Sequence, residues 1–229
     1  MARINVYNDR AIRKLAGTSF SSMRVAPGSA LQSEETGRVY YVKVAGQAIW
    51  DNTMTSIEFK TDHITEPLSS LQLHINIESV TSTSGMYVCR SFREDDNNNV
   101  VTEDYRSWLK AEQGGDVDLS NIVKYSDHIT TSGMQTFELN NNAMTDIVNR
   151  DYFQIALVTH AEVDGVENPG GSDNGDNFWV IWQTNDEDPE ITRPYLTYAT
   201  STSAKLKITS TKLNLSNSKI KISWYLYMT

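Results

Sequence analysis

Residues 68–80 read LSSLQLHINIESV, and this stretch has the clearest alternation of apolar and polar residues in the chain. Every second position from 71 to 77 is apolar while the positions between are polar; the apolar residues are Leu71, Leu73, Ile75 and Ile77. Successive side chains of an extended chain point to opposite sides, so this pattern predicts a β-strand with one buried face and one face in water.

The segments on both sides of this strand share its character. Shorter alternating runs predict further strands at residues 38–46, 54–59, 85–92, 133–140 and 193–200. The last run, RPYLTYAT, has its proline just ahead of the alternation, which suits the first position of a strand that closes a sheet because proline cannot donate to a ladder. Residues 152–163 and 177–184 are apolar on both faces, as central strands of a sandwich are.

Only two short helices are predicted. Residues 102–115 carry acidic residues early and a lysine late, which is the charge order that the helix dipole favours. Residues 140–150 begin with asparagines that can cap a helix. Many short strands between turns, with two brief helices, indicate an all-β sandwich.

Charge is distributed unevenly along the 229 residues, which carry 20 basic and 29 acidic side chains. The ends hold ten basic residues and one acidic residue, so residues 34–198 are left with 10 basic and 28 acidic ones. The predicted organisation is a basic, extended N-terminal arm (1–37) with one short helical turn around residues 9–15, a sandwich (38–200) and a basic C-terminal β extension (201–229).

The basic ends are the candidate assembly contacts. Either they fold back onto their own acidic body, or they bind the same acidic surface on a neighbouring copy. In the C-terminal extension, apolar residues alternate with lysines in three short runs, and a small sheet with one apolar face must cover something. The predicted contacts are Arg3, Arg10, Arg13, Lys14, Arg24, Leu213, Leu215, Ile220, Ile222, Trp224 and Leu226.

Composition also bears on partners and compartment. A net charge of −9 repels phosphate backbones and anionic lipids, so we expect neither nucleic acid nor a membrane as partner. The single cysteine, Cys89, cannot form an internal disulfide, and charges interrupt the first residues too often for an export signal. We therefore expect the chain to fold in a cytoplasm.

Catalytic signals are weak. The pairs Asp62–His63 and Asp127–His128 join neighbouring residues, which on a strand would point to opposite faces and make a poor dyad or chelate. No zinc-protease, dithiol or nucleophile-elbow pattern is present, and we interpret the histidines as structural. We assign no catalytic residue and no cofactor, and we expect no enzymatic activity.

Two binding features remain as alternatives. The polar, glycine-rich loop 164–177 holds Asp164, Glu167, Asp173 and Asp176, whose hard oxygen ligands suit a cation, although loops of this composition are usually only solvated. Five tryptophans could include a sugar-stacking platform, but two of them lie in the segment 177–184, where burial is the ordinary outcome.

Across residues 38–200 the segments follow one another in the order VYYVKV, SLQLHINIESV, GMYVCRSF, DYRSWLK, FELNNNAMTDIVNRDYFQIALVT and TRPYLTYAT. This order resembles the DNRLRE family of jelly-roll β-sandwiches, which are similar to carbohydrate-binding modules and occur in secreted surface proteins and in phage structural proteins. The resemblance implies a jelly-roll-like antiparallel sandwich. The chain lacks a further tryptophan that the family has near its second helix, and the family does not account for the basic ends.

Together these features suggest a bacteriophage virion structural protein, such as a capsid decoration, head-fibre or tail-associated component, assembled in the host cytoplasm. Its partners would be other virion proteins and copies of itself, with a host surface glycan as a further candidate. The alternative hypothesis is a carbohydrate-binding module of a secreted or surface protein.

Overall fold

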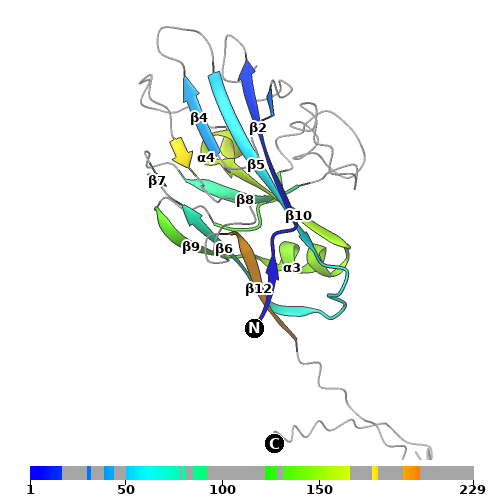
Figure 1. Cartoon of the computed structure of the whole chain (residues 1–229). Coiled ribbons are helices and arrows are strands. Elements are labelled where there is room, and N and C mark those ends of the chain that lie inside the picture. Colours follow the sequence, from blue (N-terminus) through cyan, green and yellow to red (C-terminus); the bar gives the residue numbers. More distant parts are fainter. Residues whose placement is uncertain are drawn as a thin grey trace, which may run out of the picture.

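The computed structural model of the chain describes residues 1–16, 30–31, 39–43, 50–77, 79–80, 85–91, 122–127, 131–165, 177–179 and 193–201. Within these ranges the chain forms two antiparallel β-sheets packed against each other and two short helices (Figure 1). The predicted all-β sandwich is confirmed. No helix of the described residues combines the length and the apolar character needed to cross a membrane.

The smaller sheet has four strands in the order β1 (Ala2–Asn5), β12 (Tyr195–Thr200), β6 (Leu68–Ile77) and β9 (Gly133–Glu138). Strand β6 alternates as predicted, because its apolar side chains are buried and the polar ones between them stay partly accessible. The buried side chains point into the sandwich, so the opposite face of this sheet is available to solvent.

Strand β12 is not at the edge of the sheet. Pro194 directly precedes it, as predicted, and the Pro194 carbonyl accepts a hydrogen bond from the Val6 amide at 3.3 Å. However, β1 pairs with the side of β12 that faces away from β6, so the N-terminus of the chain is the strand that closes this sheet.

The larger sheet is built around β5 (Trp50–Lys60). Strand β2 (Asn8–Ala16) pairs with one side of β5, while β4 (Val39–Lys43) and β10 (Tyr152–Thr159) share the other side. Beyond β10 lies β8 (Met86–Arg90). The short strands β3 (Ala30–Leu31), β7 (Ser79–Val80) and β11 (Asn177–Trp179) complete the sheet through β2 and β4.

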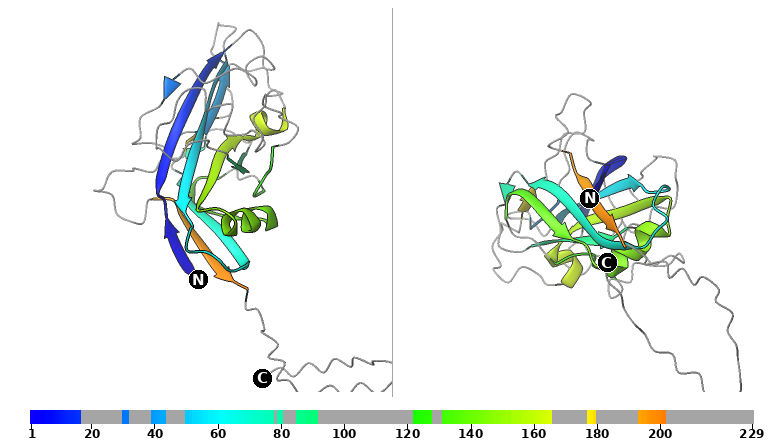
Figure 2. Two further views of the ribbon diagram at one scale, coloured as in Figure 1. Left: turned by 90° about the vertical axis from the view of Figure 1, so that its right-hand side faces the viewer. Right: turned by 90° about the horizontal axis from the view of Figure 1, so that it is seen from below.

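The N-terminal residues differ from the predicted arm. Residues 2–5 and 8–16 form β1 and β2, one in each sheet of the same chain, and residues 9–15 form strand rather than a helical turn. Figure 2 shows this segment running from the smaller sheet along β5 of the larger one. The sequence hides these strands because NDRAIRKLA has no regular apolar alternation, so the backbone ladder with β5 decides its conformation.

The helix predicted at residues 140–150 is confirmed as α3 (Asn141–Val148), and the Asn140 side chain caps it by accepting from the amides of Asn142 and Ala143. The strand predicted at 152–163 is too long. It ends at Thr159, and α4 (His160–Asp164) follows, with the Thr159 hydroxyl as its cap and Gly165 in the left-handed conformation at its end. The helix predicted at 102–115 lies outside the described residues.

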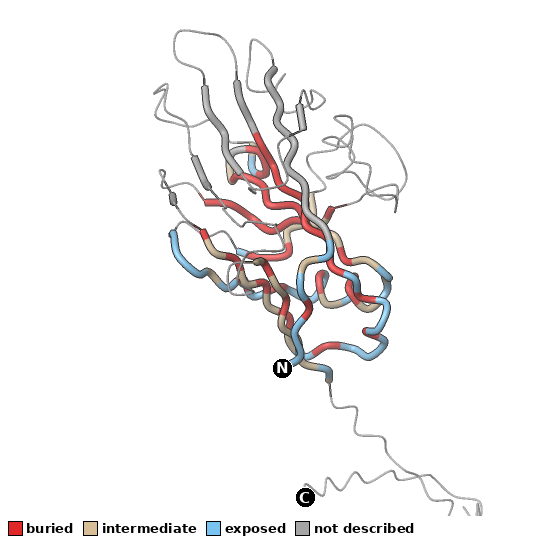
Figure 3. Tube along the Cα trace, in the orientation of Figure 1, coloured by how far each residue is buried: buried red, intermediate tan, exposed pale blue. Residues whose placement is uncertain are grey.

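The buried residues form two clusters. Figure 3 shows the buried stretches of the chain in red. The main core lies between the sheets, where Leu73 and Ile75 of β6 share one cluster with Phe153 and Ile155 of β10. A second cluster lies on the other face of β8 and β10, where Val163 of α4 packs in the same cluster. Strand β10 is therefore buried on both faces, as its continuous apolar sequence predicts.

Candidate functional site

The outer face of the four-stranded sheet carries a row of partnered polar side chains. Strand register places Asn5, Tyr195, His74 and Thr136 opposite one another across the four strands. The neighbouring row on the same face consists of Arg3, Thr197, Gln72 and Glu138. Because β6 alternates strictly, all of these residues point away from the core, and we call them the outer polar face.

Three side chains of the outer polar face are stacked on one another. The His74 and Tyr195 rings lie nearly parallel, 11° apart, with their centroids at 4.5 Å. The guanidinium carbon of Arg3 lies 4.0 Å from the centroid of the Tyr195 ring. Strands β1 and β6 flank β12 on opposite sides, so the two partners cover opposite sides of this ring and the tyrosine is held between a cation and an imidazole.

Hydrogen bonds hold His74 from both ring nitrogens. Its Nε2 lies 2.9 Å from the Thr197 hydroxyl, and its Nδ1 lies 3.1 Å from the Thr136 hydroxyl. Partial burial and the charge of Arg3 lower the pKa of His74 below its ordinary value, while Glu138 acts in the opposite direction. A neutral imidazole fits this surrounding of two hydroxyls, in which it donates to one and accepts from the other.

The second row continues the same network. The Thr197 hydroxyl donates to the Gln72 carbonyl oxygen at 3.2 Å, and the Gln72 amide donates to Glu138. The outer polar face is thus organised by its own contacts in the free chain. Such an arrangement suits recognition of a partner, because little further ordering of side chains is needed when the surface is covered.

A second polar cluster lies on the larger sheet, on the outer face of β8. Asp164 at the end of α4 accepts from the Tyr87 hydroxyl at 2.9 Å, contacts His160 Nε2 at 2.8 Å and pairs with Lys124. The Lys124 ammonium also lies 4.3 Å from the centroid of the Tyr87 ring. We call Tyr87, Lys124, His160 and Asp164 the Asp164 cluster.

The contacts of Asp164 bear on the predicted cation loop. Both carboxylate oxygens already accept from protein donors. Partial burial works against ionisation, but the hydrogen bonds from Lys124 and Tyr87 hold the pKa of Asp164 below its ordinary value. The other predicted ligands, Glu167, Asp173 and Asp176, lie outside the described residues, and the described part of the chain contains no group of three or more His, Cys, Asp or Glu side chains suited to a metal ion.

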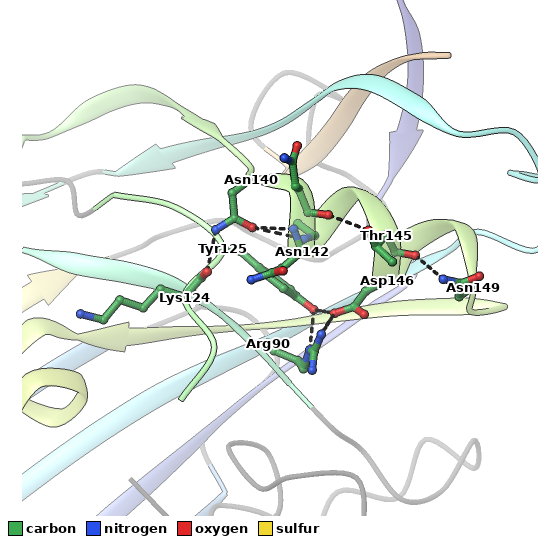
Figure 4. A network of polar contacts seen from close by, with 10 residues as sticks. Arg90, Lys124, Tyr125, Asn140, Asn142, Thr145, Asp146 and Asn149 are labelled. Carbon is green, nitrogen blue, oxygen red and sulfur yellow. Dashed lines mark hydrogen bonds and ion pairs between the residues drawn. The ribbon is translucent and has the colours of Figure 1, made fainter. Parts of the chain in front are cut away.

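A third cluster lies beneath α3 (Figure 4). Oδ2 of Asp146, a residue that is 9% exposed, accepts from Arg90 Nε at 2.7 Å and Nη2 at 2.6 Å, and from the Tyr125 hydroxyl. Burial and the hydrogen bond to Asp146 raise the pKa of Tyr125, so this phenol remains a neutral donor. We call Arg90, Tyr125 and Asp146 the Asp146 cluster; it ties helix α3 to the strand β8.

The predicted assembly residues are placed in part. Arg3 belongs to the outer polar face, and its Nε donates to Asn5 at 2.8 Å. Arg10, Arg13 and Lys14 lie on β2, opposite Ser56, Thr53 and Asn52 of β5. The other predicted contacts lie outside the described residues: Arg24, Leu213, Leu215, Ile220, Ile222, Trp224 and Leu226.

The first of the Asp-His pairs does not lie on a strand. Asp62 and His63 occupy the turn between β5 and β6, where both are exposed and His63 Nδ1 lies 3.6 Å from the Asp62 carboxylate. A turn allows neighbouring side chains to meet, which strand geometry forbids. In the second pair, Asp127 is exposed and His128 lies outside the described residues.

Sequence reasoning missed all three clusters. Each one joins residues from distant segments, and the only signal for the outer polar face was the polar half of the β6 alternation. Comparison with known proteins adds no assignment, because no protein-family model matches the chain and no curated protein is significantly similar to it.

Proposed function

We propose that this chain is a structural, non-catalytic component of a bacteriophage virion, such as a capsid decoration, head-fibre or tail-associated protein. It assembles with copies of itself and with other virion proteins through its basic C-terminal segment. The resemblance to sandwiches found in phage structural proteins supports this proposal. The charge contrast between the acidic residues 34–198 and the lysine-bearing segment supports it independently.

One observation carries the proposal. Strand β12 ends at Thr200 and is paired on both sides, with β1 and with β6. Its pairing within the sheet is therefore complete without the residues that follow. Those residues, 202–229, carry five lysines and no acidic side chain, with apolar residues between them. A segment of this kind gains most by covering an acidic surface that also buries its apolar side chains.

The N-terminal basic residues take a smaller part in this proposal than the sequence suggested. The backbone of residues 2–5 and 8–16, which carry Arg3, Arg10, Arg13 and Lys14, pairs within the same chain, so these strands form without a neighbouring copy. The assembly role therefore falls on the C-terminal segment.

The test compares the full chain with a truncation after Ser201. Sedimentation velocity at rising concentration should give a concentration-dependent mass for the full chain and the mass of a single subunit for the truncated one. A full-length variant with all five tail lysines changed to glutamine is the matched control. It should associate more weakly and lose the salt dependence of the full chain, because the charge attraction is removed. A full chain that remains a single subunit at every concentration would rule the proposal out.

A glycan-binding module remains the second candidate, and an exposed tyrosine that packs beside a half-buried one favours it. Tyr7 is 60% exposed, and its ring centroid lies 5.4 Å from that of Tyr152. Exposed aromatic rings are the groups on which sugars stack. Affinity electrophoresis in soluble polysaccharides tests this candidate: Tyr7→Ala should abolish any retardation, while Met134→Ala, at an exposed residue of the other sheet, should not.

A further inference from the structure

The outer edge of β9 is suited to pairing with an additional strand. Among the described strands, β6 is the only neighbour of β9. The amide of Leu139 donates to the Leu71 carbonyl at 2.9 Å, so this opposed pair is a hydrogen-bonded one. Bonded and non-bonded pairs alternate in an antiparallel ladder. The backbone groups of Met134, Thr136 and Glu138 therefore point away from β6, towards the outer edge.

This edge has few of the features that prevent strand addition, and its one charged side chain is Glu138 at the end of the strand. Natural sheets protect their edges with lysine, proline, bulges or very short strands. Strand β9 reads GMQTFE, contains neither lysine nor proline, and pairs with β6 without a shift of register. At the opposite edge of the same sheet, β1 has only four residues and carries Arg3, so that edge is protected.

We propose that the outer edge of β9 binds the C-terminal segment 202–229 of a second copy of this chain as an added β-strand. This inference rests on the proposed assembly role of that segment and names the surface that receives it. Strand addition supplies main-chain hydrogen bonds, and the alternate side chains of the incoming strand supply the specificity.

The chemistry of the two partners matches. Each of the three runs in the segment alternates apolar residues with polar or basic ones, as in KLKI at 205–208 and KIKI at 219–222. On β9, Phe137 is buried on the inner face, while Glu138 is exposed on the outer face. An added strand therefore places its apolar residues beside Phe137 and its lysines on the face that carries Glu138.

Cross-linking between two full-length proteins tests the pairing. One protein carries Met134→Cys, the other carries Asn214→Cys or Ser223→Cys, and a short bis-maleimide is added to the mixture. The native Cys89 is buried, so its background reaction is low. We expect a cross-linked heterodimer. Thr145→Cys on the exposed side of α3 replaces Met134→Cys as the control and should give none.

Three outcomes are informative. Equal cross-linking at 134 and 145 overturns the proposal, as does an associating full chain that gives no cross-link at 134. In both cases the assembly role of the C-terminal segment stands if truncation after Ser201 abolishes association. A chain that carries both cysteines and links only within itself would place the segment on its own β9, which overturns the contact with a second copy.

Two edge variants give an independent readout. Thr136→Pro removes an amide that points outward and leaves the donors to β6 in place, whereas Thr136→Ala keeps that amide. The proline variant should weaken self-association about tenfold or more relative to the alanine variant, the equivalent of one lost hydrogen bond. Met134→Lys, which protects the edge by charge, should act in the same direction if Thr136→Pro fails to fold. Unchanged association in the folded variants contradicts the proposal.

Discussion

The two faces of β8 carry two polar clusters of the same design in different surroundings. On the inner face, Arg90 pairs with Asp146 of α3; on the outer face, Tyr87 bonds to Asp164 of α4. The segment 122–127, which runs beside β8, contributes Tyr125 to the first cluster and Lys124 to the second. Each cluster thus connects one helix to the same strand through one carboxylate.

The difference between them is burial. The side chains of Arg90 and Asp146 are 24% and 12% exposed, whereas those of Lys124 and Asp164 are 38% and 25% exposed. When a mostly buried charge loses its ion-pair partner, little water can hydrate it. A more exposed charge is hydrated after such a loss, so the loss costs less free energy. The Asp146 cluster is therefore part of the core, whereas the Asp164 cluster attaches α4 to β8 at the surface.

The largest expected effect is on the Asp146 cluster. Asp146→Ala leaves the Arg90 guanidinium and the Tyr125 hydroxyl without their common acceptor. We expect the free energy of unfolding to fall by about 3 kcal/mol, because the loss of the buried Asp146 removes the charged acceptor of the partly buried Arg90. Urea denaturation followed by circular dichroism measures this loss.

The matched control for this prediction is Asp146→Asn, which keeps an acceptor of the same size but removes the charge. It should lose less stability than Asp146→Ala. If Asp146→Ala unfolds at the same urea concentration as the unchanged chain, the cluster does not secure α3 and the contrast with Asp164 disappears.

The second effect is smaller and depends on pH. Asp164→Asn should reduce stability by about 1 kcal/mol at neutral pH, as is typical of a partly exposed pair. The pKa of Asp164 is lowered in the folded chain, so its ionised form stabilises the fold above the ordinary value of 3.8, and this contribution is lost as pH falls through the lower, folded value. Thermal unfolding of both proteins from pH 7 to pH 3 measures the difference.

The gap between the unchanged chain and Asp164→Asn should therefore close below pH 4. Asp62→Asn serves as the control, because Asp62 is an exposed carboxylate in a turn with no contact to either cluster. A gap that stays constant down to pH 3 would show that the ionisation of Asp164 does not contribute.

The alternation of β6 and the continuous apolar sequence of β10 made much of the fold predictable. A strand with one solvent-exposed face alternates apolar and polar residues, as β6 does. A strand that is buried on both faces is a continuous apolar run, as β10 is. Strand β2 could not be found in this way, because its conformation follows from pairing with β5 and not from its own pattern. The boundary at Thr159 was missed because Ala161 and Val163 continue the apolar character of the strand into α4.

The clusters were beyond sequence reasoning for another reason. Asp146 and Arg90 are 56 positions apart, and Asp164 and Tyr87 are 77 apart, so only the strand register and the packing of each helix bring them together. The N-cap was within reach, since Asn140 stands where a capping residue is expected before a helical run.

The third prediction concerns that cap, which gives α3 a second attachment. The Asn140 side chain accepts from two helix amides, and its own amide donates to the Lys124 carbonyl at 2.8 Å. Asn140→Ala should cost about 1 kcal/mol, the usual value of an N-cap, while Asn142→Ala, at an exposed position of the same helix, should cost much less. Equal effects of the two substitutions in urea denaturation would mean that the cap and its bond to residue 124 do not help to hold α3.

The smallest expected effect is the coupling between the two clusters. They lie on opposite faces of β8 and share no side chain, so the losses from Asp146→Asn and Asp164→Asn should add to within about 0.5 kcal/mol in a double-mutant cycle. Besides β8 itself, the segment 122–127 connects them, because its consecutive residues Lys124 and Tyr125 belong to one cluster each. A coupling well above this limit would mean that loosening one cluster displaces this segment and weakens the other. The attachments of α3 and α4 would then be energetically coupled, and the Asp164 cluster could not be treated as independent of the core.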